Sequence, residues 1–214
     1  MSLPDPPVLV ITDRRMAAAP LGDILDAVLA AGARWILVRE PDLSGDALAA
    51  VIGEAGDLCA RYDATLSVSA DIDAAAAGRA RGVHLPQRLA SPESVHRARD
   101  RLGDDALIGI SAHSRDEATA AQAAGADYVT LSPVFLTASK PGYGPALGLD
   151  TLRSDCAALS IPVVALAGIE PENAAAVRQS GAAGIAVMGS IMRADDPGAV
   201  MAALCEAWIA AESD

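Results

Sequence analysis

Aromatic residues are scarce in this chain. Of its 214 residues only 3% are Phe, Trp or Tyr, although 52% are hydrophobic. The core must therefore be built from Ala, Val, Leu and Ile, which suits a repetitive, layered α/β interior. The length fits one domain covering residues 1–214, long enough for a full core and slightly short for an eight-unit barrel.

Cysteine, positive charge and long apolar runs are also in short supply. Cys59, Cys156 and Cys205 lie far apart without a C-x-x-C pair, so neither a disulfide framework nor a zinc site is indicated. The net charge of -12 disfavours binding to nucleic acid and to anionic membranes. No run approaches the roughly 20 apolar residues of a membrane span, and the N-terminus lacks the pattern of a signal peptide. We therefore expect a cytoplasmic protein whose anionic ligands need local positive groups.

Short β-rich segments alternate with alanine-rich stretches along the whole chain. The predicted strands are Val8–Thr12, Trp35–Arg39, Thr65–Ser69, Gly82–Leu85, Leu107–Ser111, Asp127–Leu131, Pro162–Ala165 and Gly184–Met188. Helical spacing is found over Leu21–Ala31, Asp46–Arg61, Ser114–Ala124 and Pro171–Ser180. Gly32, Gly125 and Gly181 each follow a helical stretch and fit left-handed C-caps.

The strands themselves indicate how the sheet is built. Segments 8–11 and 163–166 are continuously apolar, which is typical of a parallel sheet covered on both faces. Eight βα units predict a single (β/α)₈ TIM barrel with eight parallel strands. A doubly wound open sheet is the alternative, because strand count alone does not establish closure.

The ligand site of such a barrel lies in the loops at the carboxyl ends of the strands. The loop over residues 132–148 holds Lys140, the only lysine of the chain, beside Thr137 and Ser139. A compact ammonium group next to two hydroxyls suits a phosphate or diphosphate oxygen. A solvated loop lysine is the alternative interpretation.

Glycines follow the last two predicted strands. Gly168-Ile169 and Met188-Gly189-Ser190 are similar to the phosphate cradle that barrels build from these two loops. Glycines that only make tight turns would give the same pattern. If the cradle is real, Gly168→Asp should abolish phosphate binding through charge repulsion and leave the fold intact.

Two histidines and one arginine complete the set of candidates. His84 and His113 lie near the ends of the fourth and fifth strands, where they could transfer protons or make structural hydrogen bonds. Arg39 ends the second strand, where it could form a buried pair with Glu40 or hold an anion.

Motifs along nearly the whole chain point to one family. These are Ile11-Thr12-Asp13, Val38-Arg39-Glu40, Gly82-Val83-His84-Leu85-x-Gln87, Ile108-Gly109-Ile110-Ser111-Ala112-His113-Ser114, Gly125-Ala126-Asp127-Tyr128-Val129, Ser132-Pro133-Val134-Phe135-x-Thr137-x-Ser139-Lys140, Pro162-Val163-Val164-Ala165-x-Ala167-Gly168-Ile169 and Gly184-Ile185-Ala186-Val187-Met188. In their order and spacing they resemble the thiamine-phosphate synthase/TenI family of barrels.

The resemblance implies two phosphorylated ligands, and also a homodimer. One ligand is a methyl-hydroxyethyl-thiazole phosphate, and the synthases also take a hydroxymethylpyrimidine diphosphate with Mg²⁺. The positions that match the thiazole-phosphate side are Thr137, Gly168, Met188 and Gly189. The positions that match the diphosphate side are Arg39, Ser111, Ser139 and Lys140.

The chain departs from the synthase pattern on the diphosphate side. Leu37 and Pro41 stand where synthases have glutamine and lysine. Ala70 replaces one magnesium-binding aspartate, and Arg88-Leu89 replaces the second. Because Mg²⁺ requires oxygen ligands, we predict a site without a metal ligand or another cofactor.

The departures favour the activity that the resemblance implies for the TenI branch, the metal-free conversion of a thiazole carboxylate phosphate to its aromatic tautomer. His113 or His84, with Lys140 nearby, would carry the proton, since Pro133 stands where the family's tautomerase histidine is expected. One alternative is a thiamine-phosphate synthase whose Mg²⁺ site is rebuilt from Asp71 or Asp73. The other is a non-catalytic regulator that binds a thiazole phosphate.

Overall fold

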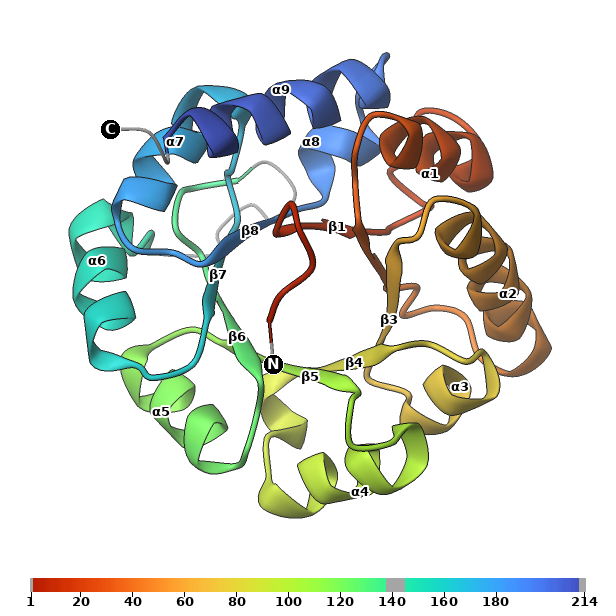
Figure 1. The fold of residues 1–214 in the computed structure, drawn as a ribbon, viewed down its shortest axis with the longest axis horizontal. Helices are drawn as coiled ribbons and strands as arrows, with labels where there is room; N and C mark the ends of the chain where they lie inside the picture. Colours follow the sequence, from red (N-terminus) through yellow and green to blue (C-terminus); the bar gives the residue numbers. More distant parts are fainter. Residues whose placement is uncertain (1, 138–144, 212–214) are drawn as a thin grey trace.

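A closed barrel of eight parallel strands forms the centre of the molecule (Figure 1). The structure, a computed structural model, describes residues 2–137 and 145–211. The strands are β1 (Val8–Ile11), β2 (Trp35–Val38), β3 (Thr65–Ser69), β4 (Gly82–Leu85), β5 (Leu107–Ala112), β6 (Tyr128–Leu131), β7 (Val163–Leu166) and β8 (Gly184–Val187). Because β8 also pairs with β1, the predicted barrel is confirmed, and the alternative prediction of an open sheet was wrong.

Helices surround the barrel in a ring (Figure 1). They are α1 (Leu21–Ala30), α2 (Gly45–Arg61), α3 (Ile72–Ala77), α4 (Pro92–Leu102), α5 (Arg115–Ala123), α6 (Gly148–Ala158), α7 (Pro171–Gln179), α8 (Gly189–Met192) and α9 (Pro197–Ala210), with a 3-10 turn at Gln87–Leu89. The strands and helices expected from the sequence end within one residue of these bounds. Gly32, Gly125 and Gly181 have φ values of 108°, 93° and 88°, as C-capping glycines should.

Strands β1, β2 and β5 to β8 contribute to two separate apolar cores, because successive side chains point to opposite faces. In β1, Val8 and Val10 pack outward against the helices, whereas Leu9 and Ile11 point into the barrel. The inward-facing apolar cluster consists of Leu9, Ile11, Trp35, Leu37, Leu107, Tyr128, Val164 and Ala186.

Trp35 and Tyr128 are the large side chains of the barrel interior. Their rings meet edge to face with centroids 4.9 Å apart, an arrangement that aromatic pairs prefer. Trp35 Nε1 donates to Ser67 Oγ at 3.1 Å, so its buried N–H group has an acceptor. Gly109 makes room for the tyrosine, because a Cβ atom at this position would lie 2.0 Å from Tyr128 Cζ.

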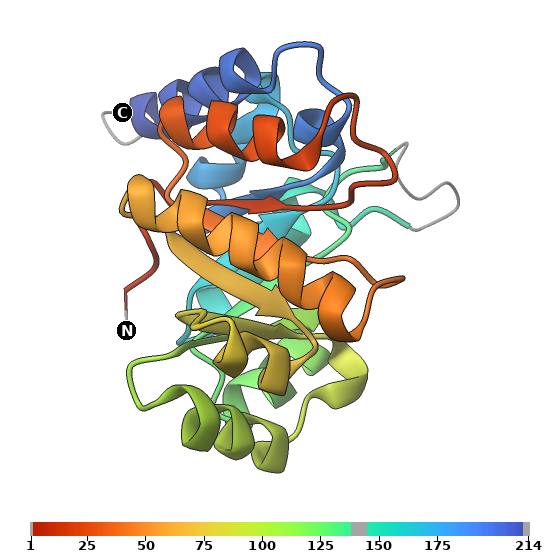
Figure 2. The same ribbon diagram turned by 90° about the vertical axis from the view of Figure 1, so that its right-hand side faces the viewer.

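The N-terminal segment crosses one end of the barrel (Figure 1). Leu3 packs against the inward-facing cluster, and Ile185 N donates to Pro7 O at 3.0 Å. Figure 2 shows this segment on the side away from the heads of the strand arrows. The opposite end, where the strands finish, is left for the loops of the site.

The structure bears on two further expectations. All three cysteines are free. Within residues 2–137 and 145–211, none of the helices combines the length and the apolar character needed to cross a bilayer.

Gly109→Ala should destabilise the protein, because its methyl group would collide with the Tyr128 ring. We expect overpacking of this kind to lower the free energy of unfolding by about 1–3 kcal/mol, measured by urea denaturation. Gly53→Ala is the matched control, since nothing lies within 4 Å of a Cβ there. In the middle of α2 it should raise stability by about 0.5–1 kcal/mol. Equal effects of the two substitutions would contradict the packing described here.

Candidate functional site

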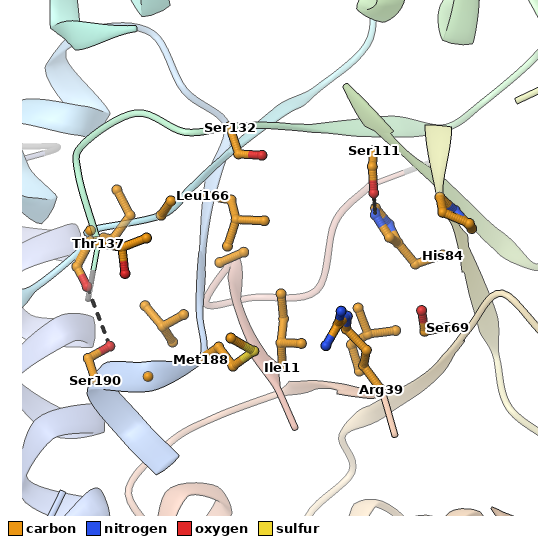
Figure 3. A pocket seen from close by; sticks show the side chains of 18 of the residues that line it. Ile11, Arg39, Ser69, His84, Ser111, Ser132, Thr137, Leu166, Met188 and Ser190 are labelled. Atoms are coloured by element: carbon orange, nitrogen blue, oxygen red, sulfur yellow. Dashed lines mark hydrogen bonds between the residues drawn. The ribbon is translucent and has the colours of Figure 1, made fainter. Parts of the chain in front are cut away.

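A cavity of about 380 Å³ opens at the carboxyl ends of the strands, where the sequence predicts the ligand site. Its floor is apolar and includes Ile11, Leu37, Leu166 and Ala186. Polar groups lie on either side of this floor, as Figure 3 shows. The cavity therefore offers two polar ends joined by a surface suited to flat or apolar ligand groups.

One polar end is formed by the loops after β7 and β8. Gly168 and Gly189 line it, and Thr137 faces Ser190 across it (Figure 3). Asn173 Nδ2 donates to the carbonyl oxygen of Gly168 at 2.9 Å, which holds the turn that leads into α7. Glycine backbone beside the first turn of a short helix is the arrangement with which barrels bind phosphate.

The other polar end is formed by strands β2 to β5. The Arg39 side chain reaches into the cavity, with Ser69 nearby and with His84 and Ser111 opposite (Figure 3). Arg88 also lines the cavity, from the 3-10 turn after β4. Two guanidinium groups and several hydroxyls make this end suitable for an anion.

The structure brings most of the predicted site residues together. The cavity is lined by Arg39, His84, Ser111, His113, Thr137, Gly168, Met188 and Gly189. Ser139 and Lys140 lie outside the described residues. The roles assigned to all ten residues stay predictions.

Glu40 pairs with a different arginine from the one expected. Its buried carboxylate accepts from Arg14 N at 3.1 Å and from the Arg14 guanidinium at 3.3 Å. The backbone N of Arg39 donates instead to Thr12 Oγ1 at 3.0 Å. The prediction that Arg39 pairs with Glu40 was therefore wrong. The two residues follow β2 in succession, and their side chains point to opposite sides. This leaves Arg39 for the cavity.

His84 is buried beneath the anion end of the cavity. Burial lowers the pKa of its imidazole to about 4, so the ring is neutral at physiological pH. Nδ1 lies 3.0 Å from Tyr128 Oη, and Nε2 lies 2.9 Å from Ser111 Oγ and 3.3 Å from Thr130 Oγ1. Because both ring nitrogens already have hydrogen-bonding neighbours, His84 is better suited to orienting these neighbours than to exchanging protons with a ligand.

His113 lies at the rim and is exposed. Its Nδ1 is 3.1 Å from the carbonyl oxygen of Ser132. Since a carbonyl oxygen can only accept, this contact favours a proton on Nδ1 and a lone pair on Nε2. Nδ1 also lies 3.2 Å from Ser132 Oγ, and with its proton on Nδ1 the ring would carry on Nε2 the lone pair with which a general base acts.

Gly168 is needed for the fold as well as for the cavity. Its φ is +67°, and a Cβ atom would lie 2.6 Å from Phe135 Cβ and 2.7 Å from Leu136 O. Gly168→Asp would therefore displace the loop after β6, and the expectation that this substitution leaves the fold intact was wrong.

The described residues do not fit a magnesium site. Glu170 is the only carboxylate on the described wall of the cavity, and no group of three metal-binding side chains occurs in the described part of the chain. Asp71 caps α3, where its Oδ1 accepts from Ala74 N at 2.9 Å. Asp73 binds Arg97 and Arg101 instead. Neither aspartate lines the cavity.

Some lining residues were not among the site residues predicted from the sequence. Ser69, Arg88 and Arg193 lie on the wall, and Tyr128 supports His84 from below. Arg193 follows Gly189 by one helical turn, a spacing that could have indicated a second group for the phosphate end. No local signal could have identified Tyr128, because its contact with His84 depends on barrel closure.

Comparisons with known proteins agree on one family. Residues 8–191 match the family model described as thiamine monophosphate synthase. The chain is 36% identical over 210 residues to the thiamine-phosphate synthase of Geobacillus kaustophilus. The aligned region covers 96% of this chain and 93% of that protein. It is 42% identical over 184 residues to the thiamine biosynthesis bifunctional protein ThiM/ThiE of Symbiobacterium thermophilum. That aligned region covers 86% of this chain but only 38% of the relative.

A solved structure is similar over the same length. The thiamine phosphate pyrophosphorylase from Pyrococcus furiosus superposes with a TM-score of 0.84 at 31% identity. The match covers 95% of this chain and 96% of that one. The similarity therefore includes all eight βα units.

The buried His84 should make stability fall in mild acid. Below its ordinary pKa of 6.5 the unfolded chain binds a proton that the folded protein excludes until about pH 4. Stability is therefore full above pH 6.5, and between pH 7.5 and 5 this residue should remove ~2 kcal/mol from the free energy of unfolding. Urea denaturation at both pH values measures the loss, with His84→Gln as the reference that lacks the titrating ring. Equal pH dependence of the two proteins would contradict a neutral, buried His84.

Proposed function

This chain belongs to the thiamine monophosphate synthase family, and we propose that it couples a hydroxymethylpyrimidine diphosphate to a thiazole phosphate. It is thus an enzyme of the thiamine-phosphate synthase/TenI family, and the proposal concerns which reaction it performs. The names of its relatives favour the synthase over the tautomerase expected from the missing aspartates.

The observation that carries the proposal is the cavity with two polar ends. Arg39 and Ser111 would bind the diphosphate at one end, and the Gly168 and Gly189 amides would bind the thiazole phosphate at the other. The apolar floor between them, including Ile11, accommodates the two rings. In the tautomerase alternative the substrate is a thiazole carboxylate phosphate, which would present a single carboxylate to this end. A diphosphate brings the larger charge that two guanidinium groups suit.

The reaction breaks one bond and makes another. The bond between the pyrimidine methylene carbon and the diphosphate oxygen breaks, and the electron pair leaves with the diphosphate. The lone pair of the thiazole nitrogen then forms the new C–N bond to that carbon. The Arg39 guanidinium stabilises the charge that builds up on the departing diphosphate. Loss of the diphosphate leaves a positive charge on the pyrimidine methylene carbon. The apolar floor excludes water, which would otherwise attack this carbocation.

No step of this proposal passes through a metal. Synthases of the family use Mg²⁺, but positions 70 and 88 hold alanine and arginine here, and Asp71 and Asp73 have other partners. We propose that Arg39, assisted by Arg88 on the same wall, neutralises the diphosphate directly.

A thiazole tautomerase is the second candidate, and His113 is the observation that favours it. Its Nδ1 contact with the Ser132 carbonyl orients the imidazole at the cavity rim. His113→Asn should abolish tautomerisation and leave coupling nearly unchanged. Tautomerisation without coupling would replace the first proposal by the second, and saturable binding without either reaction would support a regulator. The homodimer and the cytoplasmic location stay predictions.

Coupling should be insensitive to chelation and sensitive to Arg39. In purified protein we expect equal rates of thiamine phosphate formation in excess EDTA and in Mg²⁺. Arg39→Ala should weaken binding of the diphosphate substrate by roughly 10–100-fold, because a charged hydrogen-bond donor is lost.

Arg61→Ala is the matched control, since this arginine pairs with Asp26 on the surface and should not affect the reaction. A rate that disappears in EDTA would contradict the metal-free site. The absence of coupling under both conditions would refute the synthase proposal itself.

A further inference from the structure

A chain of hydrogen-bonding groups leads from the barrel interior to the anion end of the cavity. Tyr128 Oη lies 3.0 Å from His84 Nδ1, and His84 Nε2 lies 2.9 Å from Ser111 Oγ. Tyr128 is fully buried and His84 is 5% exposed, whereas Ser111 reaches the cavity wall (Figure 3). A ligand in the cavity therefore meets Ser111 and the small exposed part of His84, whereas Tyr128 lies out of its reach.

The protons in this chain admit two arrangements. In one, the Tyr128 hydroxyl donates to Nδ1, so the ring proton is on Nε2 and is donated to Ser111 Oγ. In the other, Nδ1–H donates to the tyrosine oxygen, and Nε2 accepts from Ser111. The second arrangement leaves the buried Tyr128 O–H without an acceptor, because His84 is the only hydrogen-bond partner of this hydroxyl in the described part of the chain. A buried donor without an acceptor is unfavourable, so the first arrangement prevails.

We infer that Tyr128 is a positioning residue that fixes the tautomer of His84 and thereby turns the Ser111 hydroxyl proton toward the cavity. When Ser111 accepts from Nε2–H, its own proton is available for a ligand oxygen. In the opposite tautomer the proton would point at the histidine, and the serine would present only lone pairs to an anion. The inference rests on the proposed function, because it assumes that the ligand at this end presents a phosphate oxygen to Ser111.

The surroundings hold Tyr128 in place for this role. Its ring fits against Gly109, where a Cβ atom would lie 2.4 Å from Oη, and against the edge of Trp35. Thr130 Oγ1 also lies on the Nε2 side, at the longer distance of 3.3 Å. Within the arrangement inferred here, Thr130 can accept part of the Nε2 proton, and the direction of the chain is unchanged because Tyr128 still donates to Nδ1.

The tautomer can be measured directly, without any ligand. Nitrogen-15 NMR of the full chain distinguishes the protonated ring nitrogen from the unprotonated one, and His84→Gln assigns the signals. We expect a single tautomer with the proton on Nε2 in the wild type and a loss of this preference in Tyr128→Phe. A proton on Nδ1 in the wild type would overturn the inference, whatever the protein binds.

Calorimetry with inorganic pyrophosphate tests the effect on the cavity. Tyr128→Phe should weaken pyrophosphate binding about fivefold, the worth of one ordinary hydrogen bond. In a Ser111→Ala background the same substitution should have no further effect, because the serine that it acts through is gone. Equal losses in the two backgrounds would overturn the inference.

Tyr62→Phe is the matched control, since Tyr62 donates to Asp26 at the surface, at 3.0 Å, and should not change pyrophosphate binding. If the wild type binds no pyrophosphate, the diphosphate part of the proposed function fails, and the NMR result alone decides the role of Tyr128. Should Tyr128→Phe not fold, the wild-type tautomer remains decisive.

Discussion

The interior of an eight-stranded barrel must be filled by side chains, and this constraint shapes everything above it. A chain with few aromatic residues places two of them, Trp35 and Tyr128, at the centre of the barrel. Their edge-to-face contact fills the barrel interior beneath the cavity. His84 rests on this layer, and Ser111 rests on His84. Packing and ligand binding thus share the same side chains.

The fold was largely predictable from the sequence, because hydrophobic periodicity and capping glycines are local signals. The continuous apolar run at 8–11 and the glycine at position 32 each act within a few residues of themselves. The site was predictable only to the level of which strand ends would meet. Glu40 pairs with Arg14, which lies 26 positions earlier in the chain. The local sequence around Arg39 and Glu40 gives no information about a partner so far away. The steric need for Gly168 likewise comes from the Phe135 loop, which contacts it only in the closed barrel.

The charges of the cavity are arranged differently from those of the protein as a whole. The chain is strongly acidic, yet its described cavity wall carries Arg39, Arg88 and Arg193 against the single carboxylate of Glu170. The acidic exterior repels anions at long range, whereas the arginines of the cavity wall attract them at short range. Selection for a phosphorylated ligand can therefore take place at the mouth of the barrel without making the surface basic.

The segment that closes the far end of the barrel has a practical consequence. Leu3 inserts among the inward-facing apolar side chains, and the backbone at Pro7 pairs with β8. An affinity tag attached ahead of this segment would emerge from the base of the barrel, away from the entrance used by ligands. Immobilising the protein through such a tag would leave that entrance open to solution. Trimming the chain past Leu3 would instead admit water beneath the Trp35 layer.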